Sequence, residues 1–383
     1  MNDSNQRRRI AIVVTSELTA STFVEGFAGF AAQQGNEVFV VADSIEPMRL
    51  SKGEGVLHQI PVSMAREPQP FQDLGSLFTL LRTLRRIDPE ILVYATPKAS
   101  LLASIAGFGL RIPIRIYQLW GLRLETTTGL KRRILGSLEW LTSRLSKVVL
   151  ANSASLSNLY RSLGLNAGRR LEMIGHGSSH GVDTSYFSQY AVYSKMDHET
   201  ASMLEDRRDE IKIGFVGRLH PDKGIHTLFK ALDLIAETGT NATLILVGGD
   251  EGVELELKSN DAITKMVVGH VNDPRPYYAA MDVLVLPSLR EGFPNVVLEA
   301  AAMSVPSIVS DGTGVVDSVV DGETGLVVPV EDAQELANAL LRLIADEDLR
   351  TSLGVAARVR AQRDFEQKDV WESTLTHITG IQK

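Results

Sequence analysis

The sequence predicts an α/β protein built from two open, mostly parallel sheets. Short runs of β-branched and other apolar residues alternate with amphipathic stretches, first over residues 1–180 and again from residue 211 onward. The strand-like runs are apolar almost throughout, which is typical of parallel strands covered by helices on both faces. A length of 383 residues exceeds one ordinary domain and suits two.

The first half contains alternating predicted strands and helices. The predicted strands are Ile10–Val14, Glu37–Ala42, Ile91–Ala95, Ile114–Leu119 and Lys147–Ala151. The amphipathic stretches between them predict helices over Phe23–Gln34, Leu74–Arg86, Lys98–Gly107 and Leu130–Leu145. Because a helix follows most of these strands, the strands are connected by crossovers and run parallel.

The second half repeats the pattern after a polar, charged stretch, Phe187–Glu210, which predicts a linker and an entry helix. The predicted strands are Ile211–Val216, Ala242–Val247, Lys265–Gly269, Val283–Leu286 and Ser307–Ser310. The predicted helices are Ile225–Glu237, a segment near Gly252–Leu257, Pro274–Ala280, Asn295–Met303, Asp332–Ile344 and the final stretch Val355–Ile381. In such sheets ligands bind outside the carboxyl ends of the strands, so we expect a cleft where the two domains face each other.

Composition excludes several classes of function. The chain has no cysteine, which excludes disulfides, thiolate zinc sites and a cysteine nucleophile. A net charge of −8 argues against a nucleic-acid partner. Residues 1–180 hold 21 Lys and Arg against 14 Asp and Glu, a net of +7, and residues 181–383 hold 18 against 33, a net of −15. This asymmetry indicates different partners for the two halves.

Neither a secretory signal nor a membrane-spanning segment is expected. The polar, basic start runs directly into a strand, and the longest apolar run, Ala99–Leu110, is shorter than the roughly 18–20 residues that cross a bilayer. We therefore expect a cytoplasmic protein that docks on a membrane surface.

The segment Pro287–Ala300 predicts an anion site, because it joins the carboxyl end of a buried strand to a helix. Gly292 permits a close turn and Pro294 suits the first helical turn. The N-terminal amides and dipole of that helix, about half a positive charge, favour a phosphate. Glu291 and Glu299 lie about 12 Å apart by helical rise, which fits a nucleotide sugar better than a shared metal. Two glutamates at this spacing also occur by chance.

The loop Gly217–Gly224 carries two cations, Arg218 and Lys223, between a strand and a helix. Two cations on one such loop can neutralise a diphosphate and stabilise it as a leaving group. The alternative is a solvated turn with incidental charges. Neither a Walker loop nor a dinucleotide-binding fingerprint is present.

These two segments, in this order and about 70 residues apart, resemble the retaining glycosyltransferases of the GT-B fold, family 4 type. The segments Gly175–Asp183, Asp282–Ser288 and Asp321–Pro329 extend the resemblance over most of the chain. In the first half, Ile87–Glu90, Lys98 and Tyr117–Glu125 resemble bacterial members that build surface polysaccharides on a lipid-diphosphate carrier.

The resemblance implies roles for individual residues. Arg218, Lys223 and Glu291 would be the catalytic set, with the two cations on the donor diphosphate and Glu291 on the transferred sugar. Glu299 would accept hydrogen bonds from the ribose. The implied donor-binding set is Gly217, Gly269, His270, Val271, Gly292, Phe293, Pro294, Asn295, Val296 and Glu299. No cofactor and no metal are implied, and Asp346-Glu347-Asp348 fits exposed helix-end charges better than a metal site.

One departure from the family concerns Trp120-Gly121, which stands where many members carry His-Gly. Either Arg123 makes the contact that the histidine makes in those members, or no residue of this chain takes over the role of the histidine. Trp120 either stacks on a sugar ring or packs in the core. Lys98, at a helix start, would meet the diphosphate of the acceptor.

The expected organisation is an acceptor-binding domain over residues 1–185, a donor-binding domain over 186–360, and a C-terminal helix over 361–383 that packs back toward the first domain. The first domain carries basic groups among apolar residues: Arg7–Arg9, Arg82 with Arg85 and Arg86, Lys131–Arg133, and Arg144 with Lys147. Such surfaces attract anionic headgroups, although solvated helix faces are an equal alternative.

The expected activity is transfer of a hexosyl or N-acetylhexosaminyl group from a nucleotide sugar, in particular a UDP-sugar, to a lipid-diphosphate-linked glycan or polysaccharide. The departing phosphate itself can take the acceptor's proton, so electrostatic help matters more than a protein base. The expected location is the inner face of the cell membrane. The alternatives are a UDP-sugar epimerase, a phosphorylase or another enzyme of the fold, and a non-catalytic nucleotide-sugar-binding partner.

Overall fold

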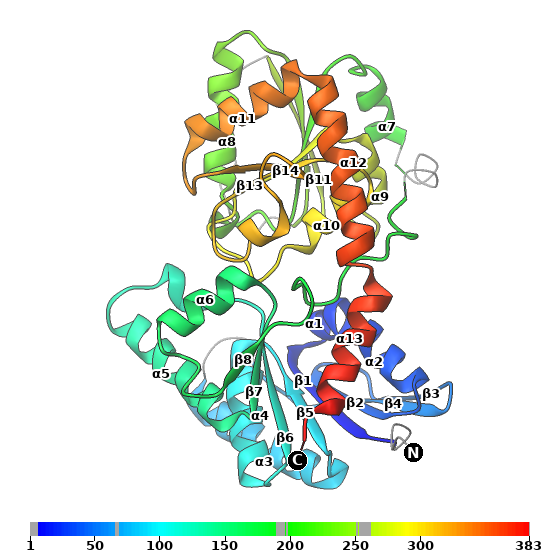
Figure 1. The fold of residues 1–383 in the computed structure, drawn as a ribbon, viewed down its shortest axis with the longest axis vertical. Coiled ribbons are helices and arrows are strands. Elements are labelled where there is room, and N and C mark those ends of the chain that lie inside the picture. The colour runs from blue at the N-terminus through cyan, green and yellow to red at the C-terminus, as the bar shows by residue number, and fades with distance from the viewer. Residues whose placement is uncertain are drawn as a thin grey trace. The chain divides into compact units, whose positions relative to one another are not determined.

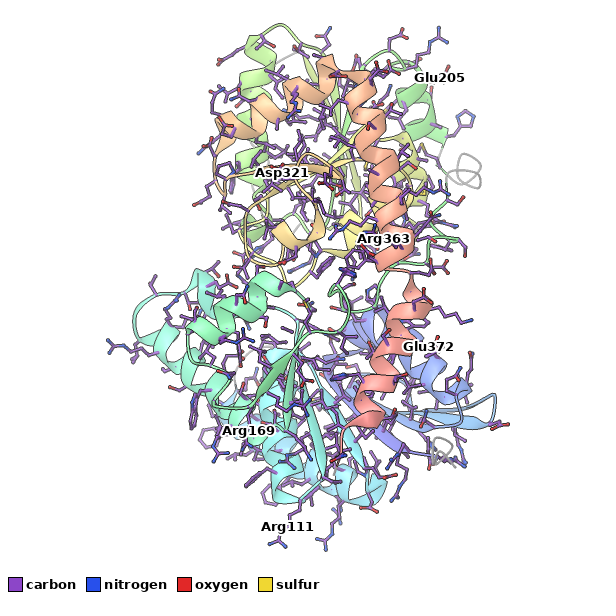
Figure 2. The ribbon with its side chains drawn as sticks, in the orientation of Figure 1. Arg111, Arg169, Glu205, Asp321, Arg363 and Glu372 are labelled. Atoms are coloured by element: carbon purple, nitrogen blue, oxygen red, sulfur yellow. The ribbon has the colours of Figure 1, made fainter. Side chains whose placement is uncertain are left out.

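The computed structural model describes residues 7–65, 69–188, 196, 198–249, 252 and 262–382, which form two compact units (Figure 1). Unit 1 comprises Met1–His180 and Asp369–Lys383, and unit 2 comprises Gly181–Lys368. The predicted helix near Gly252–Leu257 lies outside the described residues, apart from Gly252 itself. Charged side chains such as Arg111 in unit 1 and Glu205 in unit 2 point away from their own unit (Figure 2).

Unit 1 is built on an eight-stranded sheet with the order β3-β4-β2-β1-β5-β6-β7-β8. Its strands are β1 Arg9–Ser16, β2 Glu37–Asp43, β3 Met48–Lys52, β4 Gly55–Pro61, β5 Ile91–Tyr94, β6 Ile114–Leu119, β7 Val148–Ala151 and β8 Arg170–Glu172. The strands pair in parallel, except that edge strand β3 runs antiparallel to β4 within the described residues. The β3–β4 hairpin and β8 were not predicted, because none of these three strands is a continuous apolar run.

Helices cover both faces of this sheet. They are α1 Glu17–Phe23, α2 Glu25–Gln33, α3 Pro70–Ile87, α4 Pro97–Gly109, the 3-10 turn η1 Arg123–Thr126, α5 Gly129–Leu145, α6 Ala154–Ser162 and α13 Gln367–Gly380. Successive strand residues face opposite sides, so Ala11 and Val13 pack with α3 and α4, while Ile10 and Ile12 pack with α1, α2 and α13.

The predicted helix Phe23–Gln34 is confirmed as α2, but α1 before it, which begins at Glu17 with Ser16 as its N-cap, was not predicted. One helix prediction needs correction: the final stretch is two helices, with α13 separate from the helix before it. The C-terminal helix packs on unit 1, as predicted: Trp371 lies so close to α2 that a Cβ on Gly26 would come within 2.7 Å of its ring.

Unit 2 is built on a six-stranded parallel sheet with the order β11-β10-β9-β12-β13-β14. Its strands are β9 Ile211–Val216, β10 Ala242–Val247, β11 Ile263–Gly269, β12 Val283–Leu286, β13 Ser307–Ser310 and β14 Gly325–Val328. Its helices are α7 His198–Glu205, η4 Pro221–Lys223, α8 Ile225–Glu237, α9 Arg275–Ala280, α10 Asn295–Ala302, η5 Val316–Ser318, α11 Ala333–Ala345 and α12 Glu347–Asp364.

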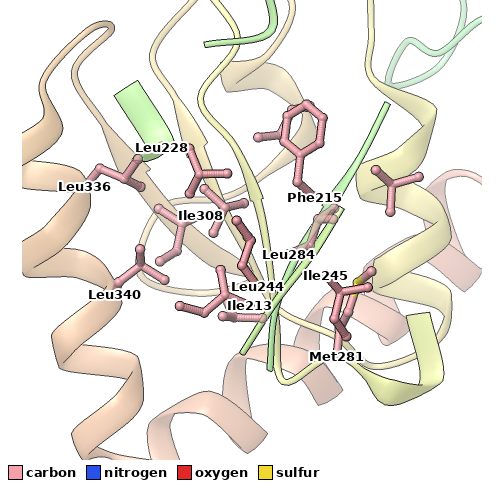
Figure 3. Close-up of a cluster of buried hydrophobic side chains, with 14 of the residues drawn as sticks. Ile213, Phe215, Leu228, Leu244, Ile245, Met281, Leu284, Ile308, Leu336 and Leu340 are labelled. Carbon is pink, nitrogen blue, oxygen red and sulfur yellow. The ribbon is translucent and has the colours of Figure 1, made fainter. Parts of the chain in front are cut away.

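The core of unit 2 forms where strand side chains meet these helices. Leu244 and Ile308 from the sheet pack with Leu228 of α8 and Leu336 and Leu340 of α11 (Figure 3). The strand order changes direction at β9, because the chain goes from β9 to β10 on one side and later returns to β12 on the other. Such a switch point leaves a crevice at the carboxyl ends of the two strands. No helix in the described part of the chain is long and apolar enough to span a membrane.

Candidate functional site

The candidate site lies at the carboxyl ends of β9 and β12, which pair with each other in unit 2. Gly217 directly follows β9 and donates its N–H to the carbonyl of Val247 at 2.9 Å. Gly248 has a φ of 147°, and a Cβ there would lie 1.8 Å from the Gly217 carbonyl oxygen. Only glycine permits this approach, which fastens the strand-end loops together. Arg218 follows Gly217 directly and is exposed.

The loop after β9 is pressed against the loop after β12. Gly224 has a φ of 71°, and a Cβ on it would lie 1.9 Å from the carbonyl oxygen of Pro287. This contact brings Lys223 to Glu291, where its ammonium donates a hydrogen bond to Oε1 of the carboxylate. A second ion pair, Arg290 to Asp222 at 2.8 Å, joins the same two loops. The structure therefore brings together two residues predicted from separate motifs.

Glu291 is fixed from several directions. Its Oε1 also accepts a hydrogen bond from the buried Ser288 hydroxyl at 3.0 Å, and its backbone N–H donates to Thr313 at 2.8 Å. The side chains of Lys223 and Glu291 are only 19% and 16% exposed. A cation and a carboxylate held side by side and partly out of water suit a ligand that carries both anionic groups and hydroxyls.

The N-terminus of α10 follows this loop. Pro294 is its N-cap residue and no side chain caps the first turn. The Phe293 ring packs 5.3 Å from the ring of Phe365 in the core of unit 2, so only its backbone can serve a ligand. Gly292 and Pro294 are buried, and Val296 packs against the main core. Asn295 opens the helix, where backbone amides and the helix dipole favour an anion.

Glu299 lies farther along α10 and has a partner that sequence reasoning missed. The hydroxyl of Tyr278, on α9, donates a hydrogen bond to Glu299 Oε2 at 2.7 Å. Burial raises the pKa of Glu299, and the hydrogen bond from Tyr278 opposes that shift. Tyr278 in turn packs edge-on against Phe187, with ring centroids 6.1 Å apart. The helix carrying Tyr278 was predicted, but no sequence signal shows what this side chain faces.

The predicted base-binding residues follow β11. Gly269 has a φ of 80°, and its carbonyl accepts a hydrogen bond from Gly248 N–H at 2.8 Å. His270 is exposed, while Val271 packs against the core. Just beyond them, Arg275 binds Asp273 through two hydrogen bonds of 2.7 and 2.6 Å. This pair of a buried arginine and a half-buried aspartate was also missed.

The predicted acceptor-side residues lie in unit 1. Lys98, at the start of α4, forms an ion pair of 2.7 Å with Asp73. Trp120 packs in the core, with its ring centroid 5.6 Å from that of Phe23, so the structure favours the packing interpretation over stacking on a sugar. Gly121 has a φ of 138°, and Arg123 is exposed on η1.

The acidic sequence Asp346-Glu347-Asp348 has a structural explanation. Asp346 is the N-cap of α12, and its Oδ1 accepts a hydrogen bond from Leu349 N–H at 2.8 Å. Over the described ranges, no group of three or more His, Asp or Glu side chains is arranged to hold a metal ion.

Both units of the chain match models of glycosyltransferase families. Residues 19–175 match the family model "Glycosyl transferase 4-like domain", and residues 210–346 match "Glycosyl transferases group 1". The chain is 34% identical over 356 residues to the capsular polysaccharide biosynthesis glycosyltransferase CapM of Staphylococcus aureus, covering 91% of each chain. It is 25% identical over 328 residues to the N,N'-diacetylbacillosaminyl-diphospho-undecaprenol alpha-1,3-N-acetylgalactosaminyltransferase of Campylobacter jejuni, covering 83% of this chain and 84% of that one.

A solved structure extends the comparison to the fold. Anabaena HepE in complex with UDP-glucose superimposes with a TM-score of 0.73 and 20% identity, covering 98% of this chain and 100% of that one. Two units built on parallel sheets, together with these matches, define the GT-B fold. The chain belongs to the bacterial glycosyltransferases of the GT-B fold, family 4 type.

Proposed function

We propose that the protein is a retaining glycosyltransferase that moves a hexosyl or N-acetylhexosaminyl group from a UDP-sugar to a lipid-diphosphate-linked glycan. The observation that carries this proposal is the pairing of Lys223 with Glu291 at the switch point of the unit 2 sheet. The two side chains come from different strand-end loops. The Glu291 carboxylate takes the place that an anionic phosphate would have beside Lys223, and the Lys223 ammonium takes the place that a sugar hydroxyl would have as a donor to Glu291.

The donor would lie along these loops. Arg218 and Lys223 hold the diphosphate, whose charge also faces the N-terminal amides of α10 at Gly292 to Val296. Glu291, released from Lys223, accepts hydrogen bonds from the sugar hydroxyls. Glu299 accepts hydrogen bonds from the ribose, and the backbone at Gly269–Val271 holds the base. The likeness to HepE, whose structure contains UDP-glucose, supports this assignment.

The chemistry follows from charge. The bond between the anomeric carbon and the β-phosphate oxygen breaks, and an acceptor oxygen bonds to the same face of the sugar, which retains the anomeric configuration. The proton of the acceptor hydroxyl passes to the departing phosphate oxygen. Negative charge grows on the diphosphate as the bond breaks, and Arg218 and Lys223 offset it, lowering the barrier without a protein base.

The acceptor would meet unit 1, with Lys98 of α4 near the acceptor diphosphate and Trp120, Gly121 and Arg123 on the same side of the reaction. The Campylobacter relative is named for a diphospho-undecaprenol substrate, which supports a lipid-linked acceptor here. The enzyme then works at the inner face of the cell membrane, where anionic headgroups attract the basic groups of unit 1.

The test is a transfer assay with a panel of labelled UDP- and GDP-sugars and a short-chain polyprenyl-diphosphate glycan. We expect transfer from a UDP-sugar, with the product anomer retained by NMR. An inverted product would refute retention. An epimerised donor formed without acceptor would identify an epimerase, and UDP binding without any turnover would identify a non-catalytic binding partner.

A further inference from the structure

Helix α3 presents an exposed face that changes from apolar to basic along its length. Phe71 is 91% exposed and Phe78 is 75% exposed, with Leu74 exposed between them. Successive helical residues are about 100° apart, so these three side chains fall within roughly 60° of one another. The same line continues into the exposed arginines Arg82, Arg85 and Arg86. Exposed phenylalanines in a row leave apolar area in water, which favours burial against a partner.

Helix α5 presents the same combination with the two kinds of residue interleaved. Leu130 is 73% exposed and Ile134 is 51% exposed, and Leu138 follows one turn later on the same face. Exposed cations and an exposed tryptophan flank this stripe: Lys131, Arg133, Trp140 and Arg144. Arg132 instead turns toward its own unit and donates a hydrogen bond to the Leu124 carbonyl at 2.7 Å.

The acidic residues of both helices point inward. Asp73 of α3 pairs with Lys98, and Glu139 of α5 accepts a hydrogen bond from the buried Tyr117 hydroxyl at 2.9 Å. Within α3 and α5, each of which is described along its whole length, the exposed side chains therefore include apolar and basic residues but no acidic ones. A surface of apolar and basic side chains without acidic ones favours a partner that has an anionic surface and an apolar interior.

The two helices belong to one layer. Side chains of α3 and α4 pack into the core on the same face of the sheet, where the Glu139 partner Tyr117 also lies. Helix α4 contacts both α3 and α5 (Figure 1). The faces of α3 and α5 that point away from this core are therefore on the same side of unit 1.

We propose that this face, which we call the α3–α5 surface (Phe71, Leu74, Phe78, Leu130, Ile134, Leu138 and Trp140 with Arg82, Arg85, Arg86, Lys131, Arg133 and Arg144), inserts its apolar side chains into an anionic lipid bilayer. Interfacial helices bury an apolar face about 5–10 Å into the boundary between headgroups and acyl chains. The flanking cations then meet lipid phosphates, and Trp140 takes the interfacial depth that suits indole.

This inference deepens the proposed function. It rests on that function only in explaining why the protein would bind a membrane. A lipid-linked acceptor has its diphosphate at the headgroup level, and Lys98, paired with Asp73 of α3, lies next to the inserted helix. Membrane insertion itself requires neither donor nor acceptor, so the two ideas can fail separately.

The test measures partitioning onto vesicles of phosphatidylcholine with and without phosphatidylglycerol, at low and high salt. We expect binding to anionic vesicles that high salt weakens without abolishing, because the apolar contribution is not screened. The double variant Leu130→Ser/Ile134→Ser should lower partitioning about tenfold or more. The matched control is Val355→Ser/Val359→Ser, two aliphatic residues four apart on α12 of unit 2, each 54% exposed, which should leave partitioning unchanged.

Insertion depth gives the second measurement. Lipids brominated along the acyl chains should quench the fluorescence of Trp140, and the variant Trp140→Phe should lose that component. Vesicle-bound protein without such quenching, or equal partitioning of both double variants, would overturn the proposal. Concentration-dependent self-association without vesicle binding would assign the surface to a second copy of the chain instead. UDP binding, measured in parallel, should be the same in both double variants, so a wild-type protein that inserts but does not bind UDP contradicts only the proposed function.

Discussion

In unit 2 the charged side chains near the strand ends pair with one another, whereas in unit 1 the exposed cations of α3 and α5 spread over the outside of a helical layer. Lys223 with Glu291 and Arg290 with Asp222 join two loops that a glycine brings into contact. The exposed cations of unit 1 stand among apolar side chains on an open face.

The difference separates two ways of recognising an anion. Charges that are paired, hydrogen-bonded and partly removed from water suit one small ligand in one geometry, because their positions are fixed before it arrives. Cations on an open apolar face suit an extended anionic surface that needs no defined geometry. The net charges of the sequence agree with this contrast, since Arg218 and Lys223 of unit 2 lie in a half rich in acidic residues, while unit 1 is basic as a whole.

The largest expected effect would come from removing the cations of the unit 2 loops. Lys223→Ala and Arg218→Ala should each lower turnover at least about 100-fold, roughly 2.7 kcal/mol of barrier, because the charge on the departing diphosphate loses a partner. The measurement is initial rate with saturating donor and acceptor. The control is Lys212→Ala at the opposite end of β9, where the ammonium donates to the Arg208 carbonyl; its rate should stay within about twofold. Unchanged rates in both loop variants would remove the proposed diphosphate role.

Unit 1 holds a half-buried acid, Glu139, which affects the stability of the unit rather than ligand binding. Burial raises the pKa of Glu139 to about 7, although hydrogen bonds from Tyr117 and Tyr160 oppose the shift. The folded state thus prefers the protonated form. The contribution of protonated Glu139 to the free energy of unfolding is fully present below its unfolded pKa of about 4.5 and is lost as the pH rises to about 7. Because the Glu139 side chain is only half-buried, solvent screening reduces the effect, and we expect the unfolding free energy to fall by about 2 kcal/mol over this range.

Glu139→Gln should remove this pH dependence. The three tryptophans, Trp120, Trp140 and Trp371, all lie in unit 1, so their fluorescence follows the unfolding of that unit alone. The difference in unfolding free energy between the wild type and Glu139→Gln should fall as pH rises from 4.5 to 7 and then level off. A difference that is constant with pH would show that Glu139 titrates normally, and would end the contrast with Glu299 of unit 2.

Glu299→Ala should weaken UDP binding about tenfold, because a carboxylate that accepts hydrogen bonds from the ribose is lost. Titration calorimetry with UDP measures this directly. The control is Glu237→Ala, an exposed glutamate at the end of α8 in the same unit, which should bind UDP as the wild type does. Equal affinities in the two variants would place the ribose elsewhere.

The sequence predicts the strands and loops that carry the candidate site better than it predicts the contacts between the side chains in it. Buried parallel strands such as Ala242–Val247 are almost continuous apolar runs, and the bounds of this strand were predicted correctly because burial on both faces leaves few polar positions. The loop positions of Lys223 and Glu291 follow from those strands. Their mutual hydrogen bond does not, because it joins residues 68 positions apart through a close approach at Gly224.

Elements with weaker patterns were missed for related reasons. The hairpin strand β3 lies at the sheet edge and is partly polar, and α6 is rich in serine, which favours caps and turns over helix interiors. The partnership of Tyr278 with Glu299 was likewise invisible, since it depends on how α9 packs against α10 rather than on either segment alone.

The smallest expected effect concerns that partnership. Tyr278→Phe keeps the ring that packs on Phe187 but removes the hydroxyl that donates to Glu299. This hydrogen bond favours the ionised carboxylate, so its loss should let the pKa of Glu299 rise further above its ordinary value. UDP affinity should fall about threefold at neutral pH, as expected for one neutral donor that only positions the binding group.

The pH profile separates positioning from packing. In Tyr278→Phe, UDP binding measured by calorimetry should begin to weaken at a higher pH than in the wild type as the pH is lowered, because Glu299 takes up its proton earlier. Tyr277→Phe removes a hydroxyl from the neighbouring buried residue on α9 and serves as the control, with an unshifted profile. If both variants shift alike, Tyr278 acts through the packing of α9. If Tyr278→Phe alone shifts, the hydrogen bond from Tyr278 helps Glu299 to work ionised, whereas Glu139 in unit 1 is kept mostly protonated below neutral pH by its burial.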